Sequence, residues 1–355
     1  TQRDPTSSSE EDSSEPSRPF KVQKNDVLCS NSTSYQVIDF IGEGCFGKVA
    51  KCLDLKTYKS VAVKIHIEND ENDIKCEVEM LEAIRTLDPE KKNITRFLES
   101  FRFNDLSCLA FEILDRSLLD LMFERDLMPM TLSEIRPVIH QLLVAFDALK
   151  GISMVHTDLK LDNIMLVNHK DQPYRVKLID FGLARPVSQL KVGDIMQPTR
   201  CRAPEVMLGL RLSEAVDMWG VGHVMAILCF GSSVCCGPCE YDLMKFMVQL
   251  VEGSSSPGWR LNSPEEYKKE AVKKCQQCQE GLENEDAMAF LNLLRSCLHL
   301  DPSKRLTPKE ALKHPFITMI HLVNDKDTNS YAGEAHQLMA VCSTCHSDEP
   351  GDPGI

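Results

Sequence analysis

The feature that most limits what this chain can fold into is a pair of short strings, VHTDLKLDNIML at residues 155–166 and KLIDFG at residues 177–182. Four of their residues lie at offsets that suit one shared chemistry: Asp158, Lys160, Asn163 and Asp180. In such a set one carboxylate can accept the proton of a hydroxyl, and a lysine can meet the charge of a phosphate. The amide and the second carboxylate can hold Mg²⁺. The spacing therefore predicts a phosphoryl-transfer site with Asn163 and Asp180 as its metal ligands.

A glycine-rich run lies upstream, between two segments with strand patterns. It spells GEGCFGKV at residues 42–49, and its glycines let the backbone approach a polyphosphate without a Cβ in the way. Alone, such a run also fits an ordinary hairpin turn. A dinucleotide-binding turn would need a helix directly after the glycines, whereas residues 48–52 have a strand pattern. That alternative is therefore disfavoured.

A lysine and a glutamate complete the phosphate site. Residues 61–64 spell VAVK, which places Lys64 on a strand where its ammonium can reach the α- and β-phosphates of a nucleotide. A helical stripe of apolar residues follows over residues 73–87. Glu77 on this helix is expected to pair with Lys64 in preference to Glu79, because Leu81 of the buried stripe lies one turn beyond Glu77.

The pattern of apolar residues divides the chain into a β-rich and an α-rich part. Strands of an antiparallel sheet are expected at residues 35–38, 48–52, 60–64, 101–103 and 109–113. Beyond Leu114 the chain is mainly helical, most clearly at residues 132–150 and 215–230. This order predicts an α+β fold of two lobes with a cleft between them. Residues 1–33 are rich in Ser, Glu, Asp and Pro, and are expected to be a disordered acidic tail.

Charge and cysteine content exclude several classes of function. The chain has 40 basic and 53 acidic residues, a net charge of −13, which disfavours direct binding to nucleic acid or to an anionic membrane surface. The longest near-apolar stretch, residues 220–231, is too short to span a bilayer. Fifteen cysteines are spread through a long chain, several inside apolar segments, which indicates reduced thiols in an intracellular protein.

Together these motifs resemble the eukaryotic protein kinase domain, over about residues 35–316. Further matching strings are RAPE at 202–205, DMWG at 217–220 and DPSKRLT at 301–307. The resemblance implies a two-lobed kinase fold, a β-rich N-lobe with one main helix and a larger helical C-lobe. Its implied parts are a domain at 34–316 with an N-lobe at 34–111, a hinge at 112–114, a C-lobe at 115–316 with an insert at about 231–285, and a C-terminal extension at 317–355.

The resemblance also implies Mg²⁺ and ATP as cofactors, and protein serine or threonine hydroxyls as acceptors, since Lys160 is typical of serine/threonine kinases. The catalytic residues that it implies are Asp158, Lys160, Asn163, Lys64, Glu77 and Asp180. The nucleotide-binding residues that it implies are Ile41, Gly42, Glu43, Gly44, Gly47, Val49, Ala62, Lys64, Phe111, Glu112, Leu114 and Met165. Structural roles are implied for Glu205, paired with Arg305, and for Asp217, which supports the catalytic loop.

Within the kinases the chain is similar to the homeodomain-interacting protein kinases of the CMGC group, which are related to the dual-specificity tyrosine-regulated kinases. The matching features are LAFEIL at 109–114, Thr157 in place of an arginine, PEVMLGL at 204–210, WRL at 259–261 and HPFITMIHL at 314–322. This similarity implies transcription regulators as partners and a location in the nucleus or the cytoplasm, although the sequence has no basic import signal.

The segment before the RAPE string departs from the family pattern. An ungapped match puts Ile195 at the position of the usual activating tyrosine, and Pro198 where serine/threonine kinases carry a hydroxyl. It puts Thr199 at the position of the arginine linked to proline-directed specificity. Because Thr157 replaces the usual catalytic-loop arginine, no guanidinium of that loop can pair with an activating phosphate. These departures motivate an alternative interpretation, a pseudokinase scaffold that binds ATP with little phosphotransfer.

Three C-x-x-C pairs compete for attention, at residues 236–239, 275–278 and 342–345. The first spells a thioredoxin-like motif and the third a haem-attachment motif, but neither has the sequence context of those sites. The first two pairs could bind zinc together. Incidental thiols are the favoured interpretation.

Overall fold

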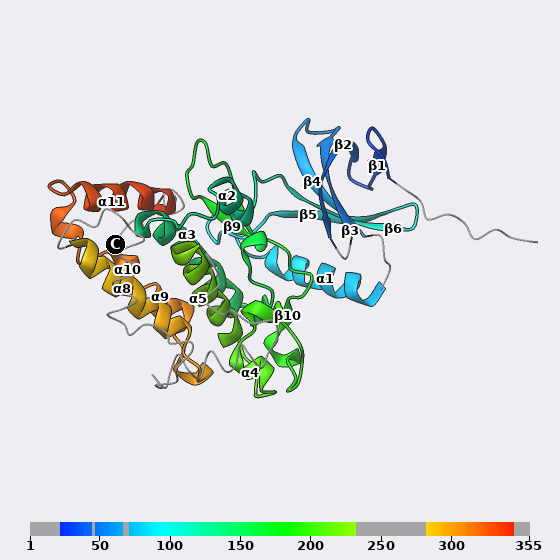
Figure 1. Ribbon diagram of the computed structural model, residues 1–355. Helices are drawn as coiled ribbons and strands as arrows, with labels where there is room; N and C mark the ends of the chain where they lie inside the picture. The colour runs from blue at the N-terminus through cyan, green and yellow to red at the C-terminus, as the bar shows by residue number, and fades with distance from the viewer. Residues whose placement is uncertain (1–21, 45–46, 67–70, 232–281, 344–355) are drawn as a thin grey trace, which may run out of the picture.

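The structure is a computed structural model that describes residues 22–44, 47–66, 71–231 and 282–343. Figure 1 shows a β-rich lobe at one end and a helical lobe at the other, so the expected two-lobed α+β fold is confirmed.

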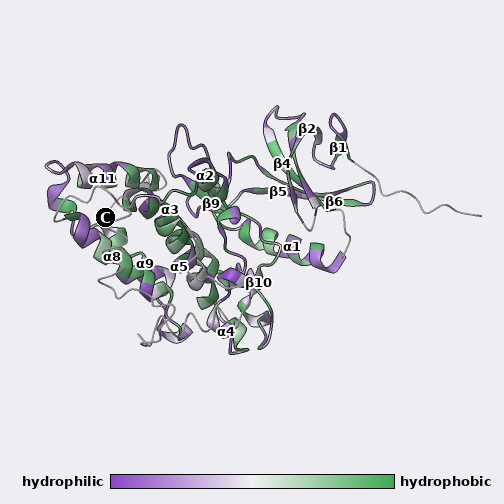
Figure 2. Ribbon diagram, viewed as in Figure 1, coloured by the Kyte–Doolittle hydropathy of each residue, from purple (hydrophilic) through white to green (hydrophobic). Residues whose placement is uncertain are grey.

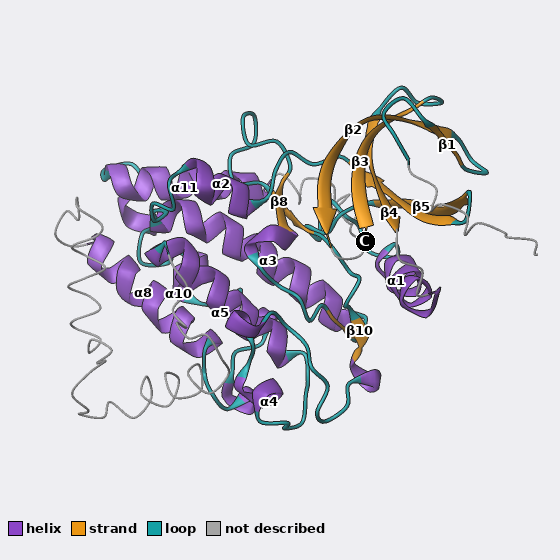
Figure 3. Ribbon diagram, turned by 45° about the vertical axis from the view of Figure 1, so that its right-hand side comes forward, coloured by secondary structure: helices purple, strands orange, loops and turns teal. Residues whose placement is uncertain are grey.

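The smaller lobe is built on one six-stranded antiparallel sheet in the order β1-β2-β3-β4-β6-β5. Its strands are β1 (Val27–Cys29), β2 (Ser34–Gly44), β3 (Gly47–Asp54), β4 (Ser60–His66), β5 (Phe97–Phe103) and β6 (Leu106–Glu112). Alternate residues along the strands point inward, and fully buried side chains such as Val37, Ala50 and Val63 form the core of this lobe. Figure 3 shows the sheet curling, with α1 (Glu71–Ile84) beside it.

The expected strands all overlap observed ones, but the helix expected over 73–87 ends earlier, at Ile84. The N–H groups of Thr86 and Leu87 bond to carbonyls only three residues back, those of Ala83 and Ile84. Such bonds tighten the chain into a turn and end the helix.

The expected disordered tail was placed too far along the chain, because residues 22–33 are part of the N-lobe. β1 pairs with β2, and Leu28 is fully buried. The hydroxyls of Ser30 and Ser32 donate to Glu99 at 2.8 and 2.7 Å. β1 is only three residues long and buries Leu28 alone, which is too short for an alternating pattern, and for this reason the sequence pattern missed this strand. Residues 1–21 lie outside the described part.

The larger lobe is mainly helical. Its helices are α2 (Leu118–Glu124), α3 (Leu132–Gly151), α4 (Pro204–Met207), α5 (Ala215–Phe230), α8 (Leu282–Cys297), α9 (Pro308–Ala311), α10 (Pro315–Thr318) and α11 (Ser330–Ser343). Capping boxes start α2 at Ser117 and α3 at Thr131, and α5 ends at Gly231 in a left-handed conformation. Figure 2 shows apolar residues gathered on α3 and α5, the centre of the lobe.

Two short strand pairs prepare the site between the lobes. β8 (Ile164–Leu166) pairs with β9 (Val176–Leu178), and β7 (Met154–Val155) pairs with β10 (Arg185–Pro186). The loop from β7 to β8 carries the first of the two sequence strings, and the turn after β9 carries the second.

The end of the described chain is packed against this lobe. α11 lies on α3, with Ala332 and Ala335 fully buried. A buried polar cluster anchors it, in which Arg136 of α3 and Tyr331 of α11 both bond to Asp286 of α8. Residues 330–342 are therefore a folded part of the C-lobe.

The C-x-x-C pairs fall almost entirely outside the described residues. Only Cys342 is described, and this buried thiol donates to the carbonyl of Pro137 at 3.8 Å. Within the described ranges there is no group of three or more His, Cys, Asp or Glu that could hold a metal ion. No helix in those ranges is long and apolar enough to cross a membrane.

Candidate active site

The loop between β7 and β8 holds the expected proton acceptor. Asp158 is only 6% exposed, and its Oδ2 accepts from Lys160 Nζ at 2.7 Å and from Asn163 Nδ2 at 3.0 Å. Asn163 Nδ2 also donates to the Asp158 carbonyl at 2.8 Å. Burial opposes the charge of Lys160, but the Asp158 carboxylate raises the pKa of Lys160 above its ordinary value. Asp158, Lys160 and Asn163 thus form one cluster.

Asp217, at the start of α5, holds the backbone of this loop by hydrogen bonds. Its two oxygens accept the N–H groups of His156 and Thr157 at 2.8 and 2.9 Å. Asp217 is almost fully buried, and burial raises the pKa of its carboxyl group. The expected support of the catalytic loop by Asp217 matches this geometry.

Thr157 connects the same loop to the segment after β9. It has a positive φ of 66°, and its hydroxyl donates to the carbonyl of Leu183 at 2.7 Å. At the position where the general kinase pattern has an arginine, this chain therefore has a direct bond to the neighbouring backbone.

Lys64 on β4 contacts two carboxylates from different elements. Its Nζ lies 2.7 Å from Glu77 Oε1 of α1 and 3.3 Å from Asp180 Oδ1. Burial opposes the ammonium charge, but the carboxylates of Asp180 and Glu77 raise the pKa of Lys64. Glu79 is exposed, so the expected pairing of Lys64 with Glu77 is confirmed.

The two carboxylates of this group differ in their titration. Burial raises the pKa of Glu77, and Lys64 works against that rise. Burial also opposes the charge of Asp180, yet Lys64 and His156 bring the pKa of Asp180 below its ordinary value. The lowered pKa favours the ionised form of Asp180, which is the form of a carboxylate that can bind a metal ion.

Asn163 and Asp180 are brought together by the β8–β9 pair. The N–H of Ile179, next to Asp180, donates to the carbonyl of Asn163 at 3.0 Å. The amide NH₂ of Asn163 donates to Asp158, so the amide oxygen of Asn163 can bind another partner. Since amide and carboxylate oxygens are ligands that Mg²⁺ prefers, these two residues fit the metal that the sequence predicts.

A cavity of about 510 Å³ opens beside Lys64, between the lobes. Ten of the twelve residues expected at the nucleotide line it: Ile41, Gly44, Gly47, Val49, Ala62, Lys64, Phe111, Glu112, Leu114 and Met165. Gly42 and Glu43 belong to β2 but are not in the lining. Asp158, Lys160 and Asn163 lie outside the lining, whereas Asp180 and Glu77 are part of it.

Gly47 shows why the run needs glycine here. Its φ is +154°, and a Cβ at this position would lie 2.0 Å from the carbonyl oxygen of Ile65. Any other residue would push β3 away from β4. Cys45 and Phe46, at the tip of the run, lie outside the described residues.

Sequence reasoning missed or left unassigned six residues of the cavity lining, Lys51, Thr95, Asp115, Arg116, Asp120 and Ile179. It placed a seventh, Ile113, in the hinge without naming it as a site residue. Lys51 could have been found, because it lies two residues after Val49 on the same strand and therefore on the same face. Thr95 and Asp120 depend on how distant segments pack, and no local pattern indicates that packing.

A buried lysine behind the hinge was also missed. Lys177 of β9 has no exposed surface, and its Nζ lies 2.6 Å from Glu90 Oε1 and 2.7 Å from Glu112 Oε1. Glu112 also accepts the N–H of Arg96 at 2.6 Å. The carboxylate of Glu112 is thus bonded behind the hinge. Only the backbone of Glu112 can then contact an adenine ring.

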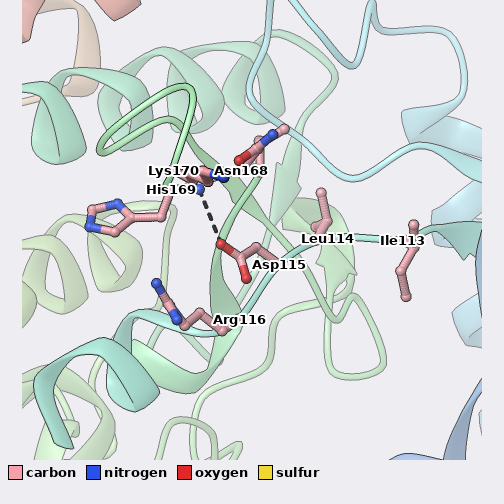
Figure 4. Close-up of a pocket in the computed structure, with 8 residues that line it drawn as sticks. Ile113, Leu114, Asp115, Arg116, Asn168, His169 and Lys170 are labelled. Atoms are coloured by element: carbon pink, nitrogen blue, oxygen red, sulfur yellow. Dashed lines mark hydrogen bonds between the residues drawn. The ribbon is translucent and has the colours of Figure 1, made fainter. Parts of the chain in front are cut away.

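A smaller pocket of about 480 Å³ lies next to the hinge and shares Ile113 to Arg116 with the main cavity (Figure 4). Asp115 accepts the N–H of His169 at 3.1 Å across it, the dashed line in Figure 4. This bond ties the end of the hinge to the loop between β8 and β9.

The segment before α4 is held by side chains that bond to backbone. Gln197, at φ 65°, donates to the Val216 carbonyl at 2.8 Å and accepts the Ala203 N–H at 2.8 Å. Arg202 donates to the carbonyls of Met196 and Gln197, each at 3.0 Å. Ile195, at the position of the usual tyrosine, is 78% exposed.

The expected structural pair is also in place. Arg305 Nη1 lies 2.6 Å from Glu205 Oε1, and both side chains are essentially unexposed. The Arg305 guanidinium lies over the ring of Trp219, 5.2 Å from its centroid.

Comparison with known proteins agrees with this geometry. The family model described as "Protein kinase domain" matches residues 35–317. Homeodomain-interacting protein kinase 2 of Mesocricetus auratus is 34% identical over 91% of this chain and 32% of its own length. Homeodomain-interacting protein kinase 1 of Caenorhabditis elegans is 33% identical over 91% of this chain and 45% of its own.

A third relative, homeodomain-interacting protein kinase 4 of Homo sapiens, is 32% identical over 86% of this chain and 58% of its own length. The chain thus spans between a third and three-fifths of the length of these relatives. The match to the family model covers both lobes and every segment of the site, and on that ground the chain belongs to the protein kinase family, with homeodomain-interacting protein kinases as similar proteins.

Proposed function

We propose that this chain is a serine/threonine protein kinase that transfers the γ-phosphate of ATP to protein hydroxyls. The observation that carries the proposal is that Lys64 of the N-lobe contacts two carboxylates at once. One is Glu77 of the N-lobe, and the other is Asp180 of the C-lobe. A kinase needs this lysine on the phosphates and this aspartate on the metal at the same time.

The catalytic loop supports a defined set of roles. Asp158 would accept the proton of the acceptor hydroxyl, and Lys160, already bonded to its carboxylate, would meet the charge of the transferred phosphate. Asn163 and Asp180 would hold Mg²⁺, which supplies charge neutralisation for the phosphates. Most of the rate enhancement would then come from positioning and from charge stabilisation.

The hinge would bind adenine through its backbone. The N–H of Glu112 already donates to the carbonyl of Arg96 at 3.1 Å, so the carbonyl of Glu112 is the group that would contact the base. Leu114 would supply the other backbone contact, and Val49, Ala62 and Met165 line the cavity with apolar surface for the ring.

Substrates, partners and location rest on similarity. Lys160 supports serine and threonine over tyrosine as acceptors, as the resemblance implies. The similar proteins are named for interaction with homeodomain proteins, so transcription regulators are the partner class that we propose, with action in the nucleus or the cytoplasm.

The test is phosphate transfer by the purified chain. The protein is incubated with Mg·ATP and a mixed library of Ser, Thr and Tyr peptides, and phosphosites are mapped by mass spectrometry. Asp180→Ala should abolish transfer, whereas Asp171→Ala, at an exposed loop residue outside the cavity lining, should leave transfer unchanged. Thermal stabilisation by ATP without any transfer would instead favour the scaffold alternative.

A further inference from the structure

We propose that His66 is a positioning residue, which holds the second oxygen of Glu77 so that the carboxylate stays aligned with Lys64. The inference rests on the proposed role of Lys64 and Glu77 in phosphate binding. His66 is absent from the motifs that identify the site and lies at the last position of β4.

The geometry places His66 on the same carboxylate as Lys64, from the same strand. Lys64 and His66 are two residues apart, so both side chains leave β4 on the face toward α1. Lys64 Nζ lies 2.7 Å from Glu77 Oε1, and His66 Nε2 lies 3.5 Å from Glu77 Oε2. The two oxygens of Glu77 are thus each faced by one nitrogen from β4.

His66 is buried, so its Nε2 atom cannot bond to water and needs a partner within the protein. The residue is 4% exposed, and Nε2 is shielded from solvent without a hydrogen bond of normal geometry among the described residues. A buried donor without a partner is unfavourable. Closing the 3.5 Å gap by a few tenths of an ångström would meet it, and such bonds often tighten only in the reactive complex.

The charges around the site favour a neutral donor at this position. Burial and the neighbouring Lys64 lower the pKa of His66 to about 4, so the imidazole is neutral at physiological pH and carries one N–H. Three charged groups face it: Lys64, Glu77 and Asp180. A neutral N–H can hold Glu77 without competing with Lys64 for its charge.

The need for a second contact arises when nucleotide binds. Lys64 is shared between Glu77 and Asp180 in the structure, and in the proposed reaction it must also contact phosphates. Glu77 would then lose part of its hold on Lys64. A bond from His66 to Oε2 would keep the carboxylate, and with it α1, in the productive position.

The backbone of His66 is held firmly enough for this role. His66 pairs with Gly47 across the β3–β4 ladder, where a Cβ on Gly47 would lie 3.1 Å from the His66 Cα. The backbone of His66 is therefore attached to the base of the glycine-rich run.

The test is a double-mutant cycle on the full chain. His66→Leu removes the donor at similar volume and should lower kcat by about tenfold, in the range seen when groups that orient a ligand are lost. His66→Gln, whose amide reaches the same point as Nε2, should restore most of that loss. In a Glu77→Gln background, His66→Leu should cause no further loss, because the group on which it acts is already altered.

His223→Leu is the matched control, since His223 is a buried histidine of α5, outside the cavity lining. Equal losses from His66→Leu in the wild-type background and in the Glu77→Gln background would show a merely structural role and overturn the proposal, as would unchanged kcat in the single variant. If His66→Leu does not fold, His66→Gln against His66→Asn decides, because the shorter amide cannot reach Oε2.

A structural readout separates this inference from the proposed function. Crystals of the wild type and of His66→Leu with Mg²⁺ and a non-hydrolysable ATP analogue should show the Lys64–Glu77 pair intact in the first and opened beyond about 4 Å in the second. An intact pair in both would overturn the role of His66 whether or not the chain transfers phosphate. Absence of transfer by the wild type would contradict the proposed function alone.

Discussion

The catalytic loop and the segment before α4 are both held by networks of side-chain bonds, but only the loop keeps the residues that the family pattern places at its catalytic positions. In the loop, Asp217 fixes the backbone and Asn163 and Lys160 fix Asp158. In the segment, the usual tyrosine position carries an exposed Ile195. There, Gln197 and Arg202 bond to the backbone on either side.

An ordered activation segment therefore does not require a phosphate in this chain. Arg202 is already bound to two carbonyls, and Thr157 bonds directly to the Leu183 carbonyl. A phosphate commonly orders such a segment by pairing with arginines. Here bonds between side chains and backbone supply that order, so we expect activity that does not depend on phosphorylation of the segment.

The largest effect should come from the loop itself. Asp158→Asn keeps the size of the side chain but removes the proton acceptor, and should lower kcat by about 10²–10⁴-fold. Because Asp158 lies outside the cavity lining, the dissociation constant of ATP should stay unchanged. Peptide phosphorylation rates and calorimetric ATP binding check this, with Asp171→Asn as the surface control. A weakened ATP affinity would contradict the separation of loop and cavity.

The next largest effect is expected at the ion pair of Arg305 and Glu205, which connects the region after the segment to the rest of the C-lobe. Arg305→Met leaves the Glu205 carboxylate buried without its partner, and should cost about 3–5 kcal/mol of unfolding free energy. Urea unfolding measures it, with the exposed Arg295→Met as control. The double variant Arg305→Met/Glu205→Leu should recover much of the loss, since it removes the unpaired charge. No recovery would mean that lost packing against Trp219 dominates.

A smaller effect is expected where the segment departs from the pattern. Gln197→Ala leaves the Ala203 N–H without its partner in a buried place and removes the bond to the Val216 carbonyl, and should cost about 1–3 kcal/mol of stability. Peptide kcat/KM should fall while the KM for ATP stays constant, because the segment is not part of the nucleotide cavity. Glu334→Ala on the exposed side of α11 is the control. An unchanged peptide kcat/KM would show that another contact orders the segment.

The sequence allowed a better prediction of the site residues than of the first strand, β1, and of buried charged residues such as Lys177. Lys64, Glu77 and Asp180 could be placed because their spacing fits a strand, a helix and a loop that carry one shared chemistry. β1 could not, because Leu28 alone supplies its burial. Lys177 was missed for a related reason: its charge is hidden between Glu90 and Glu112, which come from segments distant in the chain.

Gln197 shows the same limit within the activation segment. Comparison with the family pattern favours a loss of function, because Ile195 replaces the usual tyrosine and Pro198 replaces the usual hydroxyl. The bonds that replace them run to Val216 and Ala203, and depend on the left-handed backbone of Gln197 itself. Such a conformation is uncommon for a residue other than glycine, and the sequence did not indicate it.

The smallest effect should be at Ile195, where the departure from the family is plainest. An exposed side chain contributes little to stability, so Ile195→Tyr should change the unfolding free energy by no more than about 0.5 kcal/mol. Because Thr157 offers no guanidinium to a phosphate, the new tyrosine should also leave peptide phosphorylation unchanged, whether or not it becomes phosphorylated. Phosphatase treatment of the wild type, followed by the same assay, makes the complementary test. A large fall in activity after phosphatase treatment, or a large gain from Ile195→Tyr, would mean that the bonds of Gln197 and Arg202 do not suffice to order the segment.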